Sequence, residues 1–155
     1  MPQNCYITTP LYYVNDIPHI GHAYTTTLAD VLVRYHKLFG SDSYLMTGTD
    51  EHGQKVQQAA KARGVEPQSH VDEYNLRFKQ LWQRMDIQYD KFIRTTDSDH
   101  KAYVAESLQR LFEDDEIYFK EYAGWYSVSE ERFFAEDELK DGKDPVSGKD
   151  VEWVE

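Results

Sequence analysis

The stretch Pro18-His19-Ile20-Gly21-His22 decides the fold of this chain, because it lies between a β-favouring segment and a long helical pattern. The segment before it, Cys5 to Thr9, favours a strand and is stopped by Pro10. Asn15 or Asp16 can then cap a helix whose first turn holds Pro18. This passage from strand to helix predicts the beginning of an α/β domain, with two histidines at the start of its first helix.

A second informative stretch, Thr47-Gly48-Thr49-Asp50-Glu51-His52-Gly53, follows the next predicted strand, Ser43 to Thr47. In open parallel sheets, ligands bind beyond the carboxyl ends of the strands, which is where Asp50 falls. A carboxylate there would select a free amino acid by the charge of its ammonium group. The alternative is that Asp50 caps a helix beginning near Gly53, a common role for aspartate.

Further along, helical and strand patterns alternate. Helices are predicted from about Gln54 to Arg63, with a stop at Gly64, and from about Pro67 onward. Lys91 to Arg94 favours a third strand, and Asp97 or Ser98 can cap a last helix. Strands separated by helical segments predict a parallel sheet with crossover connections.

The spacing of apolar residues predicts which face of each helix is buried. The residues expected inside are Leu28, Val31, Leu32, Tyr35, Leu38 and Phe39 in the first helix, Val71, Tyr74, Phe78, Leu81, Trp82 and Met85 in the third, and Val104, Leu108, Leu111 and Phe112 in the last. His36, His70 and His100 have no companion cluster, so we expect them to face solvent or to pack. Asp30 and Arg34 are expected to form an ordinary ion pair one helical turn apart.

The pattern changes near Ile117, where aromatic residues begin to alternate and turn-forming residues follow. We therefore predict two domains: residues 1–116 as the first part of a Rossmann-like nucleotide-binding domain, and residues 117–155 as the start of a small inserted β-rich module. Val151 to Val154 favours a strand without an obvious partner downstream. We expect the chain to be part of a longer protein.

Composition excludes several classes of protein. With 40% hydrophobic residues, twelve Tyr and seven Phe, the chain is globular and not disordered. A net charge of −11 argues against a nucleic-acid footprint on this part of the surface. The single cysteine, Cys5, excludes an internal disulfide, and no segment has the pattern of a signal peptide or a membrane span. A reducing compartment, the cytoplasm, is expected.

The chemistry of the first stretch follows from its spacing. His19 and His22 lie three residues apart, so on a helix both side chains point to the same side. Free backbone amides at a helix start already favour an anion, and two imidazole donors would make a phosphate site there. Gly21 would let a nucleotide ring approach the backbone. The alternative is that one histidine caps the helix and the other is exposed.

The run from Ile7 to His22 resembles the amino-acid and ATP loop, with its HIGH signature, of bacterial-type methionyl-tRNA synthetases, which are class I aminoacyl-tRNA synthetases. Thr47 to Lys55 is similar to that family's second block. The similarity continues through Tyr89-Asp90 and Gly124-Trp125-Tyr126, so it covers essentially the whole chain.

The resemblance implies roles for individual residues. Methionine would contact the main chain of Leu11 and the side chain of Tyr13, and its ammonium group would pair with Asp50. ATP would be held by His19, Gly21 and His22, of which the two histidines would be catalytic. His52 would either take part in the site or only orient its loop.

The resemblance also implies the activity: ATP, with Mg²⁺, activates L-methionine to methionyl-adenylate, and the methionyl group passes to tRNA(Met). The family's lysine-rich KMSKS segment and its anticodon-binding domain are missing from this sequence, so we expect residues 1–155 alone to be inactive. Three alternatives remain open. They are another class I synthetase, a small-molecule nucleotidyltransferase with the same helix, and, for residues 1–155 alone, a non-catalytic binding domain.

Many relatives hold a structural zinc ion in the inserted module. The resemblance places the four corresponding positions at Ser127, Glu130, Asp144 and Ser147, none of which is cysteine or histidine. Tetrahedral zinc prefers thiolate and imidazole ligands, so we expect no structural zinc and no other metal site. The module is then expected to be held by packing of Tyr122, Trp125, Tyr126, Phe133, Phe134 and Trp153.

Overall fold

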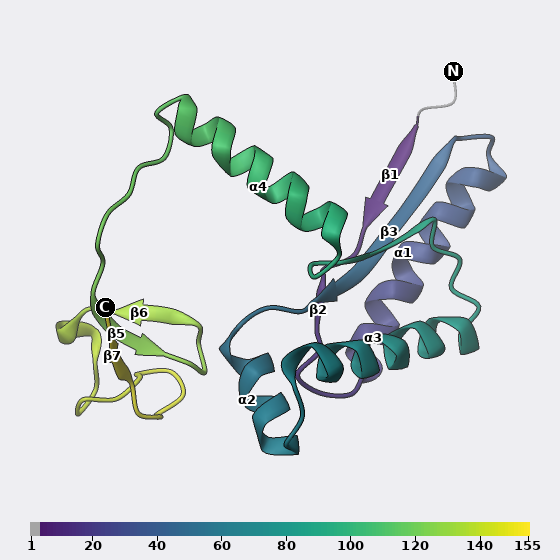
Figure 1. Cartoon of the computed structure of the whole chain (residues 1–155). Helices are drawn as coiled ribbons and strands as arrows, with labels where there is room; N and C mark the ends of the chain where they lie inside the picture. Colours follow the sequence, from purple (N-terminus) through teal and green to yellow (C-terminus); the bar gives the residue numbers. More distant parts are fainter. Residues whose placement is uncertain (1–3) are drawn as a thin grey trace. The chain divides into compact units, whose positions relative to one another are not determined.

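The computed structural model describes residues 4–155, which form two compact units, residues 4–104 and 105–155. Each unit is described by itself (Figure 1). The first contains β1 (Cys5–Thr8), β2 (Tyr12–Tyr13), α1 (Ile20–Leu38), β3 (Ser43–Asp50), α2 (Gln54–Arg63), α3 (Pro67–Arg84) and β4 (Lys91–Arg94). Helix α4 (Ser98–Glu113) contains the boundary, and the second unit holds β5 (Gly124–Ser127), β6 (Arg132–Phe134), a short 3-10 helix (Glu136–Glu138) and β7 (Glu152–Val154).

Strand β3 is the centre of a parallel sheet. Met46 pairs with Thr8 of β1 and with Lys91 of β4, so these two strands lie along opposite edges of β3. The parallel α/β fold predicted from the sequence is therefore confirmed. Strand β2 was not predicted: after Pro10, the chain resumes pairing on the same edge as β1, and β3 extends to Asp50. Strand β3 thus ends beside Tyr13 of β2.

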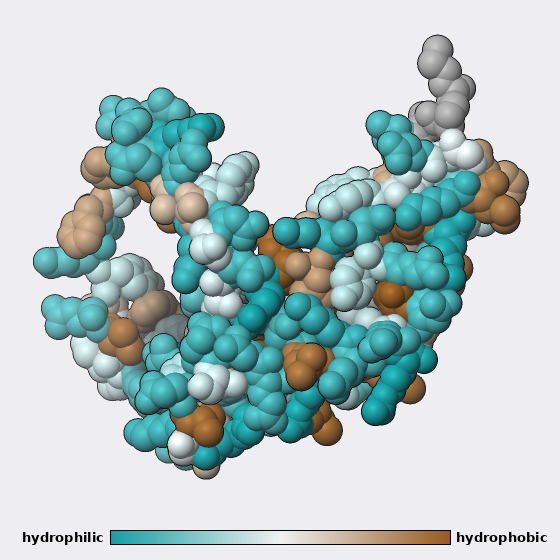
Figure 2. Space-filling model, turned by 45° about the vertical axis from the view of Figure 1, so that its right-hand side comes forward, coloured by the Kyte–Doolittle hydropathy of each residue, from teal (hydrophilic) through white to brown (hydrophobic). Residues whose placement is uncertain are grey.

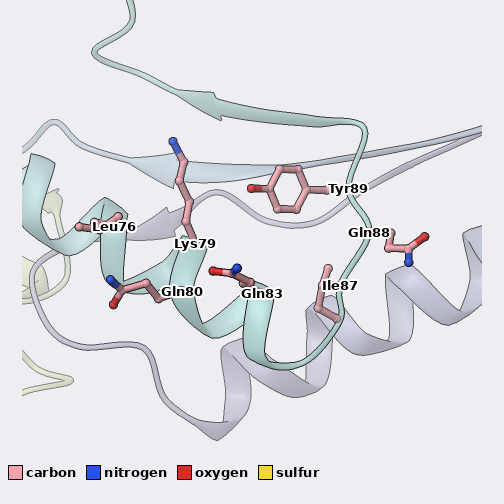
Figure 3. A pocket seen from close by; sticks show the side chains of 7 residues that line it. All are labelled: Leu76, Lys79, Gln80, Gln83, Ile87, Gln88 and Tyr89. Carbon is pink, nitrogen blue, oxygen red and sulfur yellow. The ribbon is translucent and has the colours of Figure 1, made fainter.

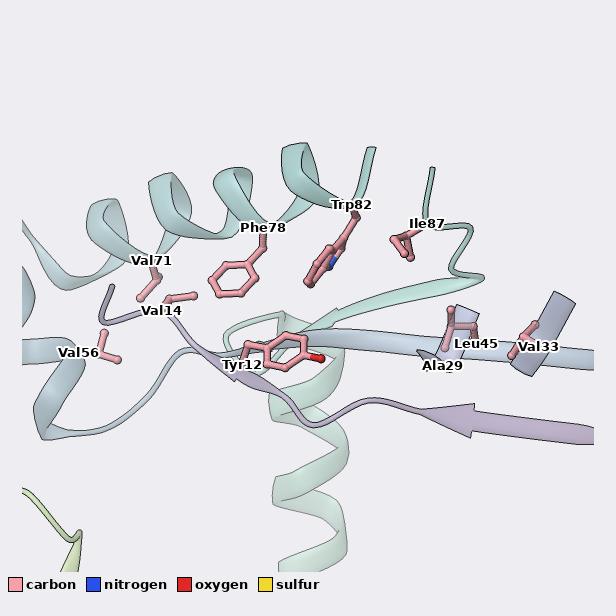
Figure 4. Packing of buried hydrophobic residues seen from close by; sticks show 10 residues of the cluster. All are labelled: Tyr12, Val14, Ala29, Val33, Leu45, Val56, Val71, Phe78, Trp82 and Ile87. Atoms are coloured by element: carbon pink, nitrogen blue, oxygen red, sulfur yellow. The ribbon is translucent and has the colours of Figure 1, made fainter. Parts of the chain in front are cut away.

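The core of the first unit lies between one face of this sheet and helices α1 and α3 (Figure 4). Phe78 and Trp82 of α3 are fully buried and pack against Tyr12 of β2. Val71 lies in the same cluster, so the stripe predicted for this helix is largely confirmed. Helix α2 ends at Gly64, as predicted, because this glycine adopts the left-handed conformation with φ of 68°.

The buried face of α1 is not the predicted one. The helix buries Thr26, Ala29, Asp30 and Val33, whereas its six predicted core residues are exposed, Leu38 by 80%. Periodicity identifies a stripe of large apolar residues but does not show which neighbouring stripe meets the sheet. Polar Asp30 can be buried because its carboxylate accepts hydrogen bonds from the Arg34 side chain and, beyond the expected ion pair, from the Gln88 amide.

The stripe predicted for α4 is also wrong, since no described residue of this helix is buried. Leu108 and Phe112 are 50% and 56% exposed. The helix is amphipathic by sequence, but its apolar side meets no complementary face within residues 4–155 that buries it.

The second unit is a small antiparallel sheet with the order β6-β5-β7. The strand predicted at the end of the chain has its partner upstream, since Trp153 of β7 pairs with Trp125 of β5 and the two rings lie 5.3 Å apart. Phe133 of β6 contacts Tyr122 and Tyr126, with ring centres 4.9 and 5.0 Å apart. The β-rich character of this region is as expected, and the domain boundary between residues 116 and 117 stays a prediction.

The face of the molecule seen in Figure 2 is largely hydrophilic. Figure 2 shows hydrophilic residues over most of the visible face, with hydrophobic ones in scattered groups, in keeping with a net charge of −11. None of the helices described between residues 4 and 155 is long and apolar enough to cross a membrane.

Candidate active site

The two histidines of the first stretch cap helix α1 together. His19 is the N-cap residue, and its Nδ1 accepts a hydrogen bond from the Gly21 amide over 3.1 Å. In return, Nδ1 of His22 accepts from the His19 amide, also over 3.1 Å. This is a capping box built from imidazoles, and it satisfies two backbone donors at the helix start. The prediction that Asn15 or Asp16 caps a helix whose first turn holds Pro18 is wrong: α1 begins at Ile20, and the Asp16 carboxylate accepts from the Ile17 amide instead.

The capping bonds determine which ring nitrogen carries hydrogen. Because each Nδ1 accepts a bond from an amide, a neutral imidazole in this arrangement must carry its hydrogen on Nε2. His19 and His22 can therefore each donate one hydrogen bond from Nε2. Their ring centres lie 3.8 Å apart with nearly parallel planes, so the two donors lie side by side. Capping the helix and donating to a ligand are thus compatible roles.

His22 is held more firmly than His19. Its ring lies 4.8 Å from that of Tyr12 and 5.2 Å from that of Phe78, so the core supports it from behind. This burial lowers the pKa of His22 below its ordinary value, and the nearby His19 lowers it further. The lowered pKa favours neutral His22, which is the form that its capping bond needs.

Gly21 leaves room for the His19 ring. A Cβ atom at this position would lie 3.0 Å from Cε1 and 3.1 Å from Nδ1 of His19, closer than ordinary contacts. A side chain here would therefore push the imidazole away from the helix start. This requirement adds to the predicted role of Gly21 in allowing a ligand to approach.

A cavity of about 450 Å³ opens beside the two histidines. It is lined by Leu11, Tyr12, Tyr13, Asn15, Asp16, Ile17, His19 and His22. The structure thus brings together four of the predicted site residues, namely Leu11, Tyr13, His19 and His22. Imidazole donors and aromatic rings on its wall suit a ligand with both an anionic and an apolar part.

Asp50 lies at the carboxyl end of β3 next to Tyr13, although it does not line this cavity. Its alternative role as a helix cap is excluded, because α2 begins at Gln54 with Gly53 as N-cap and without a side-chain capping bond. Nε2 of His52 lies 3.2 Å from the carbonyl oxygen of Thr95, so His52 holds the loop that follows Asp50.

Two buried polar residues near the site were missed from the sequence. Glu51 is 4% exposed, and Arg94 binds its carboxylate with Nε 2.8 and 3.1 Å from the two oxygens. Burial lowers the pKa of Arg94, but hydrogen bonds and charge from Glu51 and Asp72 outweigh it and raise this pKa above its ordinary value. The adjacent acids Asp50 and Glu51 are the sequence signal that could have revealed this ion pair, but a role was predicted only for Asp50.

His70 is the second buried polar residue that was missed from the sequence. It is completely buried, and its Nε2 lies 2.8 Å from the carbonyl oxygen of Val14 while Nδ1 lies 3.0 Å from a guanidinium nitrogen of Arg63. His70 therefore packs, as expected, but it also ties α3 to the chain just after Tyr13. Nothing in the sequence around His70 distinguishes it from a surface histidine.

A second cavity, of about 470 Å³, lies along α3 and the segment that follows it (Figure 3). Its lining residues are Leu76, Lys79, Gln80, Gln83, Ile87, Gln88 and Tyr89. It contains none of the predicted site residues, and three of its seven lining residues are neutral amides, Gln80, Gln83 and Gln88. We therefore place the candidate active site at the start of α1.

Three of the four positions that the resemblance places at zinc ligands, Ser127, Asp144 and Ser147, lie in one hydrogen-bonded cluster. Asp144 is 1% exposed, and its carboxylate accepts bonds from the Ser127 hydroxyl and from the amides of Val146 and Ser147, the latter two over 2.8 and 3.1 Å. The Ser129 hydroxyl, 2.8 Å from the Ser147 hydroxyl, also belongs to this cluster. Three hydroxyls and one carboxylate do not fit a zinc ion. Among residues 4–155, no group of three or more His, Cys, Asp and Glu side chains is arranged to hold a metal.

A sequence profile described as tRNA synthetases class I (M) matches residues 5–152. The methionine--tRNA ligase of Streptococcus pneumoniae is 51% identical over 162 residues, covering 98% of this chain and 24% of the relative. That of Caldanaerobacter subterraneus is 48% identical over 154 residues, covering 99% and 24%. The chain therefore spans about a quarter of the length of the curated relatives that it matches.

Solved structures of tRNA synthetases also match this chain. The methionyl-tRNA synthetase of Mycobacterium tuberculosis, in complex with methionyl-adenylate, matches with a TM-score of 0.90 and 40% identity over 98% of this chain and 31% of that one. The leucyl-tRNA synthetase of Agrobacterium radiobacter, in a ternary complex with tRNA, matches with a TM-score of 0.80 at 20% identity, which shows the fold alone. The architecture is therefore that of the class I tRNA synthetase catalytic domain. Within this class, the chain belongs to the methionine family, the tRNA synthetases class I (M).

Proposed function

We propose that this protein is a methionine–tRNA ligase, which forms methionyl-adenylate from ATP and L-methionine and transfers the methionyl group to tRNA(Met). The observation that carries the proposal is the paired imidazole cap of α1, which presents two Nε2 donors at a cavity in a chain of this family. The relatives named above carry this activity in their names, and one of the solved structures contains the adenylate.

The first step needs no nucleophile from the protein. A carboxylate oxygen of methionine attacks the α-phosphorus of ATP, the bond to the bridging oxygen breaks, and pyrophosphate leaves with the electron pair. Negative charge builds up on the phosphate oxygens in the transition state. Nε2–H groups of His19 and His22, with the helix start behind them, would stabilise this charge. Mg²⁺ would accompany ATP, as is general for phosphoryl chemistry.

Methionine would lie on the Tyr13 and Asp50 side of the site. The Leu11 main chain and the Asp50 carboxylate would bind its ammonium group, and the Tyr13 ring would pack on the amino acid. In the second step a ribose hydroxyl of the tRNA terminus attacks the adenylate carbonyl, loses its proton, and AMP leaves. Catalysis in both steps would depend on positioning and on charge stabilisation.

For the second unit, we infer that residues 117–155 begin the connective module of the family and that this module holds no zinc ion. The inference is supported by the Ser127, Ser129, Asp144 and Ser147 cluster, which uses both oxygens of the carboxylate for hydrogen bonds. We also propose that the protein acts in the cytoplasm, where its substrates are found.

The decisive experiment is ATP–pyrophosphate exchange by the complete protein with a panel of amino acids. We expect exchange with methionine and none with leucine, isoleucine, valine or cysteine. Exchange with one of those four would indicate another class I synthetase. Nucleotide transfer to a small molecule without amino-acid-dependent exchange would indicate a nucleotidyltransferase, and ATP binding with neither reaction a binding domain.

A further inference from the structure

Glu51 has an unusual environment for an acidic residue. Its side chain has no exposed area, and five hydrogen bonds converge on its two oxygens. Oε1 accepts from the Thr49 hydroxyl over 2.7 Å, from Arg94 Nε over 2.8 Å and from the Asn75 amide over 3.3 Å. Oε2 accepts from Arg94 over 3.1 Å and from the Thr96 hydroxyl. The carboxylate is therefore fully paired although no water can reach it.

The backbone beside Glu51 is held as well. Its amide donates to the Thr95 hydroxyl over 2.9 Å, and the Thr95 amide donates to the carbonyl oxygen of Thr49 over 3.3 Å. The neighbouring His52 ring contacts the Thr95 carbonyl oxygen. Residues 49 to 52 are thus attached at several points to the turn that joins β4 to α4.

This attachment determines where Asp50 points. Successive side chains of a strand point to opposite faces, so Thr49 and Glu51 share one face while Asp50 lies on the other. The direct bond between the Thr49 hydroxyl and the Glu51 carboxylate shows this arrangement at the end of β3. With both neighbours held on the buried face, Asp50 is directed to the face of Tyr13, its partner in β2.

A buried ion pair is a costly way to stabilise a protein. Removing two charges from water costs several kcal/mol, and apolar residues of similar size often serve stability equally well. What the pair does provide is one defined geometry, since each oxygen of Glu51 has fixed donors. We therefore propose that Glu51, with Arg94, is a positioning residue that orients Asp50 to receive the ammonium group of the amino-acid substrate. This rests on the function proposed above for Asp50.

The test compares Glu51→Gln with two other variants in the complete protein. Glu51→Gln keeps the size of the side chain but removes its charge. It also places an amide nitrogen, which can only donate, among groups that themselves donate to residue 51. Thr96→Val removes only one hydroxyl donor and serves as the mild version if Glu51→Gln folds poorly. Asp72→Asn is the matched control, because Asp72 also binds Arg94 but is half exposed.

We expect Glu51→Gln to weaken methionine binding about ten- to a hundredfold, the cost of a misplaced binding group, and Thr96→Val to weaken it less. ATP binding should stay within about twofold of the wild type in both variants, and Asp72→Asn should bind both ligands normally. Hydrogen–deuterium exchange of the peptide around Asp50 should rise in Glu51→Gln without any ligand. A lower melting temperature with unchanged methionine affinity and unchanged exchange near Asp50 would overturn the proposal.

The hydrogen–deuterium exchange measurement also separates this proposal about Glu51 from the proposed function of the protein. If wild-type protein does not bind methionine, the function assigned above fails. Unchanged hydrogen exchange around Asp50 in Glu51→Gln would still count against Glu51 as a positioning residue, whereas a rise confined to residues 49–52 would support it.

Discussion

At the scale of single residues, the site depends on histidines that have two tasks. His19 and His22 use Nδ1 to cap α1 and keep Nε2 free to donate. A helix that begins in this way offers its ligand two oriented donors without any rearrangement. Preorganised donors of this kind contribute most where charge develops during reaction.

Replacing either histidine therefore has a defined cost. We predict that His19→Ala and His22→Ala each slow methionine-dependent adenylate formation by about 10²- to 10³-fold, the usual loss for one transition-state donor. Methionine affinity should change little, because Asp50 and Tyr13 are unaffected. Pyrophosphate-exchange kinetics measure the first effect and calorimetric titration the second. His36→Ala, near the other end of the same helix, is the control. Normal rates of pyrophosphate exchange in both His19→Ala and His22→Ala would refute the proposed roles of the two histidines.

The lowered pKa of His22 gives a pH dependence whose sign can be stated. The unfolded chain binds a proton at His22 near pH 6.5, whereas the folded protein does so only at lower pH. The contribution of His22 to the free energy of unfolding should therefore be complete above about pH 6.5. It should fall as the pH drops through this value towards the pKa of His22 in the folded protein. Protonation also removes the Nδ1 acceptor of the cap. NMR titration of His22 should give a midpoint below 6.5, and a midpoint above it would contradict this assignment.

At the scale of secondary-structure elements, strand β3 is the most constrained part of the first unit. It pairs with β1 and β2 along one edge and with β4 along the other. Gly48 lies where β3 and β4 approach closely: a Cβ atom there would lie 2.1 Å from the carbonyl oxygen of Ile93. The strand therefore needs glycine two residues before Asp50.

We predict that Gly48→Ala destabilises the protein by about 1–3 kcal/mol or more, because a backbone atom cannot move aside as a side chain can. Urea denaturation measures the loss. Gly124→Ala is the matched control in strand β5, where the added Cβ would lie 3.2 Å from the Phe133 ring, which can shift. An equal loss in the two variants would mean that close approach of β3 and β4 is not the cause.

At the level of the whole chain, the second unit is held together by hydrogen bonds to a buried carboxylate. Strand β5 and the turn around Ser147 meet at the buried Asp144, whose bonds from Ser127, Val146 and Ser147 hold its pKa well below the ordinary value although burial acts in the opposite direction. These hydrogen bonds therefore favour the charged form of the Asp144 carboxylate.

We predict that the complete protein contains no zinc bound to this unit and that a chelator leaves its melting temperature unchanged. Asp144→Ala should lower that temperature, because it leaves two amides and a hydroxyl unpaired in a buried place. Elemental analysis of protein purified without chelator, followed by thermal denaturation, measures both effects. One tightly held zinc ion per chain, lost on replacing Asp144, would contradict this prediction.

The order of most elements, the parallel sheet and the place of the histidines could be predicted from the sequence. These features depend on signals that act within a few residues, such as apolar spacing in α3, the stop at Gly64 and the proline before His19. His19 and His22 were found in this way, and Leu11 and Tyr13 through the family resemblance; all four do meet at one cavity.

Three features became known only from the folded chain: the buried face of α1, the existence of β2, and the interior position of Glu51, His70 and Asp144. Each of these depends on partners far along the chain: Glu51 is bound by Arg94, 43 residues away, and His70 by the Val14 carbonyl, 56 residues away. An acidic or imidazole side chain is stable inside a protein only when such donors or acceptors meet it. Spacing along the sequence carries no information about that meeting, so the buried polar residues behind the site became visible only in the folded chain.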